Sequence, residues 1–129
     1  MREEQRLVHE FVAERPTMFD NNRDPKRMAE LLRQEMDELL VEIDKEDVNG
    51  IAGELPDVVW FCLTIAEIYG IDLENAFWAK GIRNQEKYPA SMFDNGMTYE
   101  QAHTLCRALW GGNDEDYFDL PTVLDNGGV

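Results

Sequence analysis

Apolar residues recur along most of this chain at the spacing of an α-helix, three or four residues apart. This pattern predicts four long helices, over residues 2–14, 25–46, 51–69 and 73–88. A shorter fifth helix is expected over residues 98–110. No segment alternates apolar and polar residues convincingly, as a half-buried strand does. The pattern therefore predicts an all-α fold, a helical bundle of four core helices with a short fifth helix.

The residues at the expected helix ends are of types that favour such ends. Asp24-Pro25 suits the start of the second helix, because aspartate caps backbone N–H groups and proline fits the first helical position. Gly70 can adopt the left-handed conformation that ends the third helix. Thr98 and Gln101 have capping-box spacing at the start of the fifth. A turn is expected over residues 47–50.

Length and composition limit the classes of protein that the chain can represent. Its 129 residues suit one domain, expected over residues 1–110, followed by an acidic, glycine-rich tail over residues 111–129. The net charge of −15 argues against binding a nucleic acid polymer. Neither a basic-then-apolar leader nor an 18-residue apolar span is present, so we expect a soluble, cytoplasmic protein without a membrane segment. Cys62 lies in an apolar run and is expected to be a buried thiol.

Two acidic pairs, Glu35-x-x-Glu38 and Glu54-x-x-Asp57, lie inside apolar helical patterns. Residues three positions apart share one helix face. Glu35 falls in the middle of the apolar arc of its helix, Glu54 falls among apolar residues of the next, and Asp57 falls at the rim. The arc around Glu35 comprises Met28, Leu31, Leu32, Met36, Leu39, Leu40 and Ile43.

Ordinary amphipathic helices carry their acids on the solvent face, which is the alternative interpretation of these four residues. A buried carboxylate without a partner costs several kcal/mol, so it is normally neutralised, paired or bound to a metal ion. Ligands that are all oxygen atoms favour Mg²⁺, Mn²⁺ or Ca²⁺ over zinc. The placement of the acids in the apolar arcs therefore favours a site for a divalent cation.

Pro56 lies inside the second acidic pair. Proline removes an intrahelical hydrogen bond and is best tolerated in the first turn of a helix. The third helix is therefore expected either to start near Gly53 or to kink at Pro56, close to the predicted metal site.

The two acidic pairs, separated by fifteen residues, resemble the motif of the MazG-like all-α nucleotide pyrophosphohydrolases, the group that includes dCTP pyrophosphatase and dimeric dUTPase. The resemblance covers about residues 5–89. Gly70-Ile71-Asp72-Leu73 looks like the link into the last core helix of that family. His9-x-Phe11 followed by Arg15 looks like the first helix of the dCTP-cleaving branch. The basic closing segment of the family is similar to Lys80, Asn84, Lys87, Tyr88 and Pro89.

The resemblance implies hydrolysis of a nucleoside or deoxynucleoside triphosphate to its monophosphate and pyrophosphate, in nucleotide-pool sanitation or control. The metal ligands would be Glu35, Glu38, Glu54 and Asp57, which would hold Mg²⁺, with Mn²⁺ as a possible substitute. The bound ions would activate the attacking water. Glu38 is the residue we assign as general base. The alternative is a catalytically idle binding or regulatory protein that keeps the MazG fold, which Pro56 favours.

The predicted substrate contacts come from three segments. Lys80, Asn84 and Lys87 recur at i, i+4 and i+7, which is one helix face, where they would meet the leaving pyrophosphate. Tyr88 would donate a hydrogen bond to a phosphate or sugar oxygen. The nucleotide pocket would include Phe19 and His9.

Four such helices cannot cover all their apolar faces within one chain, so we expect oligomerisation to complete the bundle as a homodimer or homotetramer. The residues that suggest this interface are Trp60, Phe61, Ile65 and Ile68.

Overall fold

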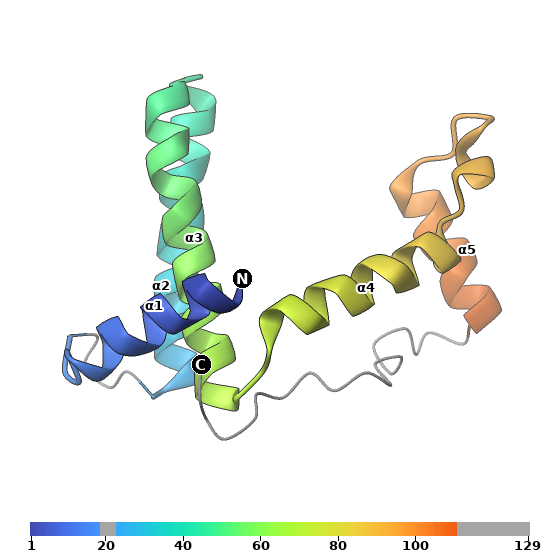
Figure 1. The fold of residues 1–129 in the computed structure, drawn as a ribbon. Coiled ribbons are helices and arrows are strands. Elements are labelled where there is room, and N and C mark those ends of the chain that lie inside the picture. Colours follow the sequence, from blue (N-terminus) through green and yellow to red (C-terminus); the bar gives the residue numbers. More distant parts are fainter. Residues whose placement is uncertain (19–22, 111–129) are drawn as a thin grey trace. The chain divides into compact units, whose positions relative to one another are not determined.

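The structure is a computed structural model that describes residues 1–18 and 23–110. Within these residues the chain forms five α-helices and one short 3₁₀ helix, and no strand, which confirms the predicted all-α fold (Figure 1). In chain order the elements are α1 (Arg2–Ala13), α2 (Pro25–Asp44), α3 (Val48–Tyr69), α4 (Leu73–Lys87), η1 (Ala90–Phe93) and α5 (Tyr99–Trp110). These elements form two compact units. The first ends at Leu73 and contains α1 to α3, and the second begins at Glu74 and contains α4, η1 and α5.

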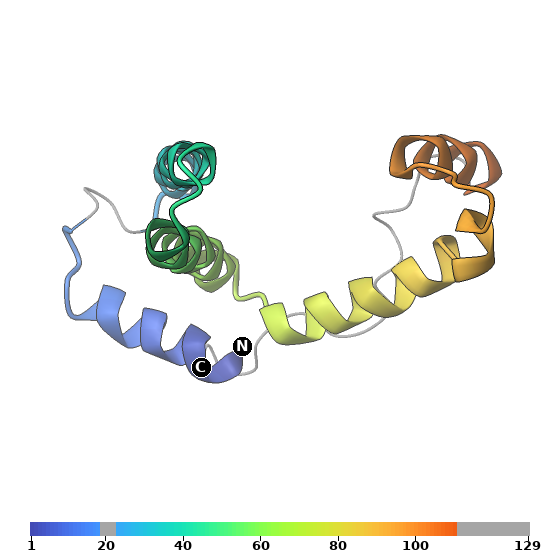
Figure 2. The same cartoon turned by 90° about the horizontal axis from the view of Figure 1, so that it is seen from above.

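In the first unit, α3 is the helix on which the other two pack. It runs along α2 and also contacts α1 (Figure 2). The ring of Phe11 on α1 meets the indole of Trp60 on α3 edge to face, with ring centroids 5.1 Å apart. Trp60 therefore packs inside the unit, and it is half-buried there. The buried core consists of Val8, Met28, Phe61, Leu63 and Ala66.

The link between α3 and α4 is tied to α1 by a buried glutamine. Gln5 is 0% exposed; its Nε2 atom donates to the Ile71 carbonyl at 2.6 Å, and its Oε1 atom accepts from the Leu73 N–H at 3.3 Å. Beside it, the guanidinium of Arg2 pairs with the carboxylate of Asp72 at 2.8 Å. These bonds fix the short chain segment between the two helices.

Most of the predicted helix ends are confirmed. Asp24 caps α2 by accepting from the Lys26 N–H at 3.0 Å, and Gly70 ends α3 with a left-handed φ of 64°. Thr98 and Gln101 form the reciprocal hydrogen bonds of a capping box, at 2.9 and 3.2 Å. Local side-chain chemistry was sufficient to set these ends.

The turn predicted over residues 47–50 is wrong. Asp47 is the cap of α3, because its side chain accepts from the Gly50 N–H at 3.1 Å, and Val48 is already the first helical residue. A Cβ atom at Gly50 would overlap the carboxylate of Glu42, so glycine allows the close approach of α2 and α3 at this end.

Pro56 lies inside α3, eight residues after its first residue. The prediction that α3 starts near Gly53 is therefore wrong. Proline has no N–H to donate to the carbonyl of Ala52, so the helix lacks one of its ordinary hydrogen bonds at this point. The second acidic pair nevertheless lies within a single continuous helix.

In the second unit, α5 meets the end of α4 at Lys87. Ala79 on α4 and Ala102 and Cys106 on α5 are buried. The Cys106 thiol donates to the carbonyl of Lys87 at 3.1 Å. The segment between these helices contains η1.

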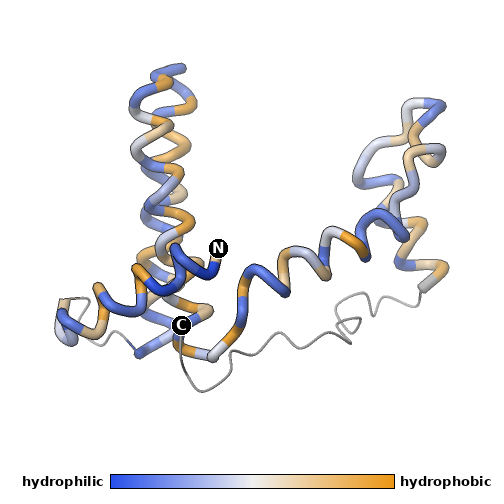
Figure 3. Tube along the Cα trace, in the orientation of Figure 1, coloured by the Kyte–Doolittle hydropathy of each residue, from blue (hydrophilic) through white to orange (hydrophobic). Residues whose placement is uncertain are grey.

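Several residues expected in the core are exposed. On α2 these are Met36, Leu40 and Ile43, and on α3 the thiol of Cys62 is exposed rather than buried. The reason is that α2 packs mainly on α3, so the faces of these two helices that are turned away from their neighbours stay exposed. Apolar residues, in orange, recur along both helices (Figure 3). None of the described helices is long and apolar enough to cross a membrane.

Candidate functional site

Three of the four predicted metal ligands converge where α2 and α3 run side by side. Glu35, Glu38 and Glu54 each place one carboxylate oxygen within 4.8 Å of the other two. Glu35 and Glu54 are half-buried, while Glu38 is exposed. Residues 35 and 38 lie one turn apart on α2, and the packing of α2 along α3 brings both close to Glu54.

The buried atoms of this cluster fit a divalent cation. The Oε2 atoms of Glu35 and Glu54 are buried and have no hydrogen-bond partner among the described residues. A buried carboxylate oxygen without a partner is costly, and a bound cation removes that cost. Since every candidate ligand atom is a carboxylate oxygen, the cluster suits a hard divalent cation such as Mg²⁺, Mn²⁺ or Ca²⁺.

The pKa values of the cluster also favour a bound cation. Burial raises the pKa of Glu35 to about 7, and a hydrogen bond with Glu38 and the charges of Glu38 and Asp57 add to the shift. The pKa of Glu54 is also raised, first by desolvation and then by the charge of Glu38. Ionised carboxylates at this spacing repel one another, and a bound cation would neutralise that repulsion.

Asp57 is not one of the three converging residues. It is exposed and lies one turn after Glu54 on α3, and its charge acts on both Glu35 and Glu54. This position at the edge of the cluster agrees with its place at the rim of the apolar arc. Its role as a metal ligand remains a prediction.

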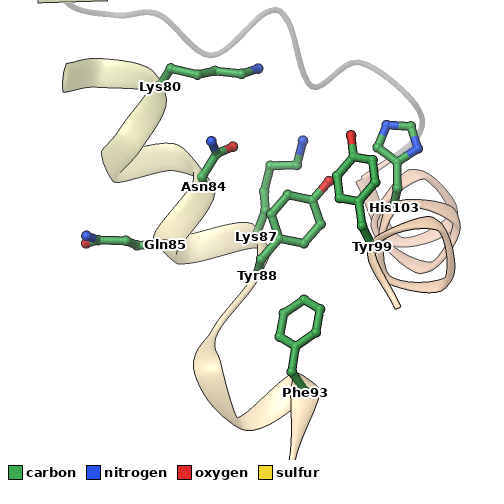
Figure 4. Close-up of a pocket in the computed structure, with 8 residues that line it drawn as sticks. All are labelled: Lys80, Asn84, Gln85, Lys87, Tyr88, Phe93, Tyr99 and His103. Carbon is green, nitrogen blue, oxygen red and sulfur yellow. The ribbon is translucent and has the colours of Figure 1, made fainter. Parts of the chain in front are cut away.

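The second unit contains a cavity of about 560 Å³ between α4, η1 and α5 (Figure 4). Its lining includes four of the five residues of the basic closing segment, all except Pro89. Among these, Lys87 is only 3% exposed, and its Nζ atom lies 5.4 Å from the centre of the Tyr88 ring. No acidic residue lines this cavity in the described part of the chain. The lining residues are Lys80, Asn84, Gln85, Lys87, Tyr88, Phe93, Tyr99 and His103.

Four lining residues were not predicted from the sequence: Gln85, Phe93, Tyr99 and His103. The Tyr99 ring lies between two others, with its centroid 6.1 Å from that of Tyr88 and 5.6 Å from that of His103. Tyr99 and His103 are four residues apart, which places them on one face of α5 and is a signal visible in the sequence. The sequence does not show that this face borders a cavity shared with residues of α4.

A smaller cavity, of about 200 Å³, lies in the first unit, and His9 is one of its lining residues. The Nδ1 atom of His9 is 2.7 Å from Oε2 of Glu67, and the other carboxylate oxygen of Glu67 is buried with no hydrogen-bond partner in the described chain. The rest of the lining is Val12, Ala13, Pro16, Arg23, Thr64 and Ile68. Phe19, the other residue predicted for the nucleotide pocket, lies outside the described residues, as does the segment 111–129.

Comparison with known protein families gives one match. The MazG nucleotide pyrophosphohydrolase domain matches residues 23–88, which is just over half of the chain. The matched segment contains both acidic pairs and the residues from Lys80 to Tyr88, and it leaves out α1 and α5. Neither a search of curated proteins nor a search of solved structures found a match.

Proposed function

Because the chain belongs to the MazG nucleotide pyrophosphohydrolase domain family, we propose that it hydrolyses nucleoside or deoxynucleoside triphosphates to monophosphate and pyrophosphate. The observation that carries this proposal is the convergence of Glu35, Glu38 and Glu54, with buried carboxylate oxygens that have no other partner. Its role would be to remove surplus or non-canonical nucleotides or to control the nucleotide pool, in the cytoplasm.

We assign the metal site to Glu35, Glu38, Glu54 and Asp57, with Mg²⁺ as the ion and Mn²⁺ as a substitute. A divalent cation bound there supplies charge neutralisation of the phosphates and lowers the pKa of a bound water. Glu38, the exposed member of the converging group, serves as general base by accepting a proton from the attacking water.

The cavity of the second unit supplies the groups that bind phosphate. Lys80 and Lys87 neutralise charge on the phosphate chain, while Asn84 and Tyr88 donate hydrogen bonds to its oxygens. Phosphoryl transfer requires mainly positioning and charge stabilisation, so such groups are sufficient without a protein nucleophile.

The smaller cavity is proposed to hold the nucleobase. A volume of about 200 Å³ is below the roughly 300–1,000 Å³ of pockets for drug-sized ligands, so it suits one heterocycle. His9 and Glu67 provide its polar groups, and Val12 and Ile68 provide apolar walls. Phe19 is proposed to contribute from the neighbouring segment.

A homodimer or homotetramer is the proposed assembly. Support comes from large apolar side chains that are exposed on both long helices of the first unit. On α2 and α3 they are Met36, Leu40, Val41, Ile43, Val48, Leu55 and Val59. Burial of such a surface between copies would stabilise helices that one chain covers incompletely.

A second candidate function is that of a catalytically idle protein that binds nucleotides and keeps the fold. The observation in its favour is Pro56, which lies between Glu54 and Asp57 and leaves the carbonyl of Ala52 without its ordinary hydrogen bond in α3. In that case the protein would bind a nucleoside triphosphate and release no product.

The test is incubation with a panel of nucleoside triphosphates and Mg²⁺, with monophosphate and pyrophosphate as the products measured. We expect turnover by the natural protein and its loss in Glu35→Gln and Asp57→Asn. Asp37→Asn is the matched control, because Asp37 is an exposed acid on the same helix and is outside the converging group. Absence of product from every substrate would eliminate the enzyme and leave the binding protein.

A further inference from the structure

Helix α5 lies outside the segment that matches the family, yet it forms one wall of the cavity that contains Lys80 and Lys87. Its contribution is Tyr99 and His103, whose side chains stand opposite the lysine-bearing face of α4 (Figure 4). The phenol hydroxyl of Tyr99 and the amines of the two lysines lie on the same side of the cavity in this view.

The packing of α5 holds these two side chains in place. Ala102 is 0% exposed and Cys106, one turn further along α5, is also buried, so the face of α5 next to Tyr99 and His103 is covered. The hydrogen bond from the Cys106 thiol to the Lys87 carbonyl ties the helix to the residue that carries a lining cation. The wall is therefore a built part of the second unit.

The charge of the cavity is unusual for this protein. The chain has a net charge of −15 and contains four lysines and two histidines. Two of those lysines and one of those histidines line this cavity, with no carboxylate among the described lining residues. One of the lysines, Lys87, is almost fully buried. Cations and neutral hydrogen-bond donors that line one cavity favour an anion.

We propose that α5 completes a pyrophosphate-binding site, in which the Tyr99 hydroxyl and a ring N–H of His103 donate hydrogen bonds to the anion that Lys80 and Lys87 neutralise. This inference rests on the proposed function, since pyrophosphate is the leaving group of that reaction. It adds to that function two binding residues from a helix outside the family segment. It also makes inorganic pyrophosphate a ligand in its own right and a product inhibitor.

The experiment is calorimetric titration of the full chain with inorganic pyrophosphate in the absence of divalent cations. Without a metal ion the acidic cluster of the first unit repels the ligand, so the measured affinity reports on the cationic cavity. We expect Tyr99→Phe and His103→Ala each to weaken binding about tenfold, because each removes a hydrogen bond to a charged group.

Two matched controls are available. Tyr69→Phe removes a phenol from α3, and Thr104→Ala changes the residue next to His103; neither position lines the cavity, so both variants should bind like the natural protein. Circular dichroism confirms that each variant keeps its helices. Unchanged affinity in either Tyr99→Phe or His103→Ala would overturn the role of that residue, and no binding by the natural protein would overturn the site.

Hydrolysis assays on the same proteins separate this inference from the proposed function. Pyrophosphate binding that depends on Tyr99 and His103, without hydrolysis of any nucleotide, would reject the enzyme and support the anion site. Hydrolysis together with pyrophosphate binding that both variants leave unchanged would reject the inference and support the enzyme.

Discussion

The Nδ1 atom of His9 lies 2.7 Å from the Oε2 atom of Glu67, a contact that joins α1 to α3 at the smaller cavity. The side chain of His9 is 45% exposed and that of Glu67 is 13% exposed. Pairs with one exposed member add only about 0–1 kcal/mol to folding stability. A small effect on folding is compatible with the proposal that this contact orients two polar groups toward a nucleobase.

On this basis His9→Ala should raise the KM for the preferred nucleoside triphosphate about tenfold and change kcat little, because it removes a contact made equally in the ground and transition states. Steady-state kinetics measures both constants. Glu10→Ala, at the adjacent exposed position, should leave both unchanged. If His9→Ala has the same KM as the natural protein, this cavity does not bind the substrate.

The raised pKa of Glu35 predicts how the stability of the metal-free protein depends on pH. Its pKa is about 7 in the folded chain and 4.5 as the ordinary value, so between these values the folded state binds the proton more tightly. The free energy of unfolding should therefore fall as the pH rises through this interval. The stabilisation that protonated Glu35 provides should be fully present below pH ~4.5. Glu35→Gln should remove this part of the pH dependence, as measured by denaturant titrations.

Addition of Mg²⁺ should reverse that loss. The ion binds the ionised carboxylates, so the rise in Tm that it causes should be larger above pH ~7 than at pH ~5. Thermal denaturation with and without Mg²⁺ at the two pH values checks this. An equal rise at both values, or the same rise in Glu35→Gln, would contradict the assignment of this cluster as the metal site.

Gln5→Met should lower the free energy of unfolding by about 1–3 kcal/mol. Methionine keeps the length of the buried side chain but leaves the Ile71 carbonyl and the Leu73 N–H without their partner. Denaturant unfolding gives the difference. Gln34→Met, at an exposed position on α2, is the control and should change stability by less than about 0.5 kcal/mol. Equal stability of the two variants would mean that the α3–α4 link does not depend on Gln5.

Pro56→Ala should raise the free energy of unfolding by up to about 3 kcal/mol, because it restores the hydrogen bond to the Ala52 carbonyl inside α3. Gly53→Ala is the matched comparison: it has open space for a Cβ atom and should gain only about 1 kcal/mol from helix propensity. A lower stability in Pro56→Ala would show that the surrounding structure requires proline here. The metal-induced rise in Tm, measured on the same variant, reports whether Pro56 affects the acidic cluster.

The all-α fold and most helix ends were predictable from the sequence because their causes are local. Apolar spacing defines the helices, and Asp24, Gly70 and Thr98 make hydrogen bonds or adopt dihedral angles within a few residues of their own positions. The turn at residues 47–50 was mistaken for the same reason: several polar residues and a glycine indicate a turn, but one cap bond from Asp47 is sufficient to start a helix there.

By itself, then, the sequence determined the helices, the acidic pairs on α2 and α3, and the lysine-bearing face of α4. Only the tertiary structure decided which side chains meet: that three of the acids converge while Asp57 stays at the edge, that Gln5 holds the α3–α4 link, and that α5 adds Tyr99 and His103 to the cationic cavity. The physical reason is that helical periodicity places a residue on a face of its own helix, whereas its neighbours depend on how that face packs against other helices.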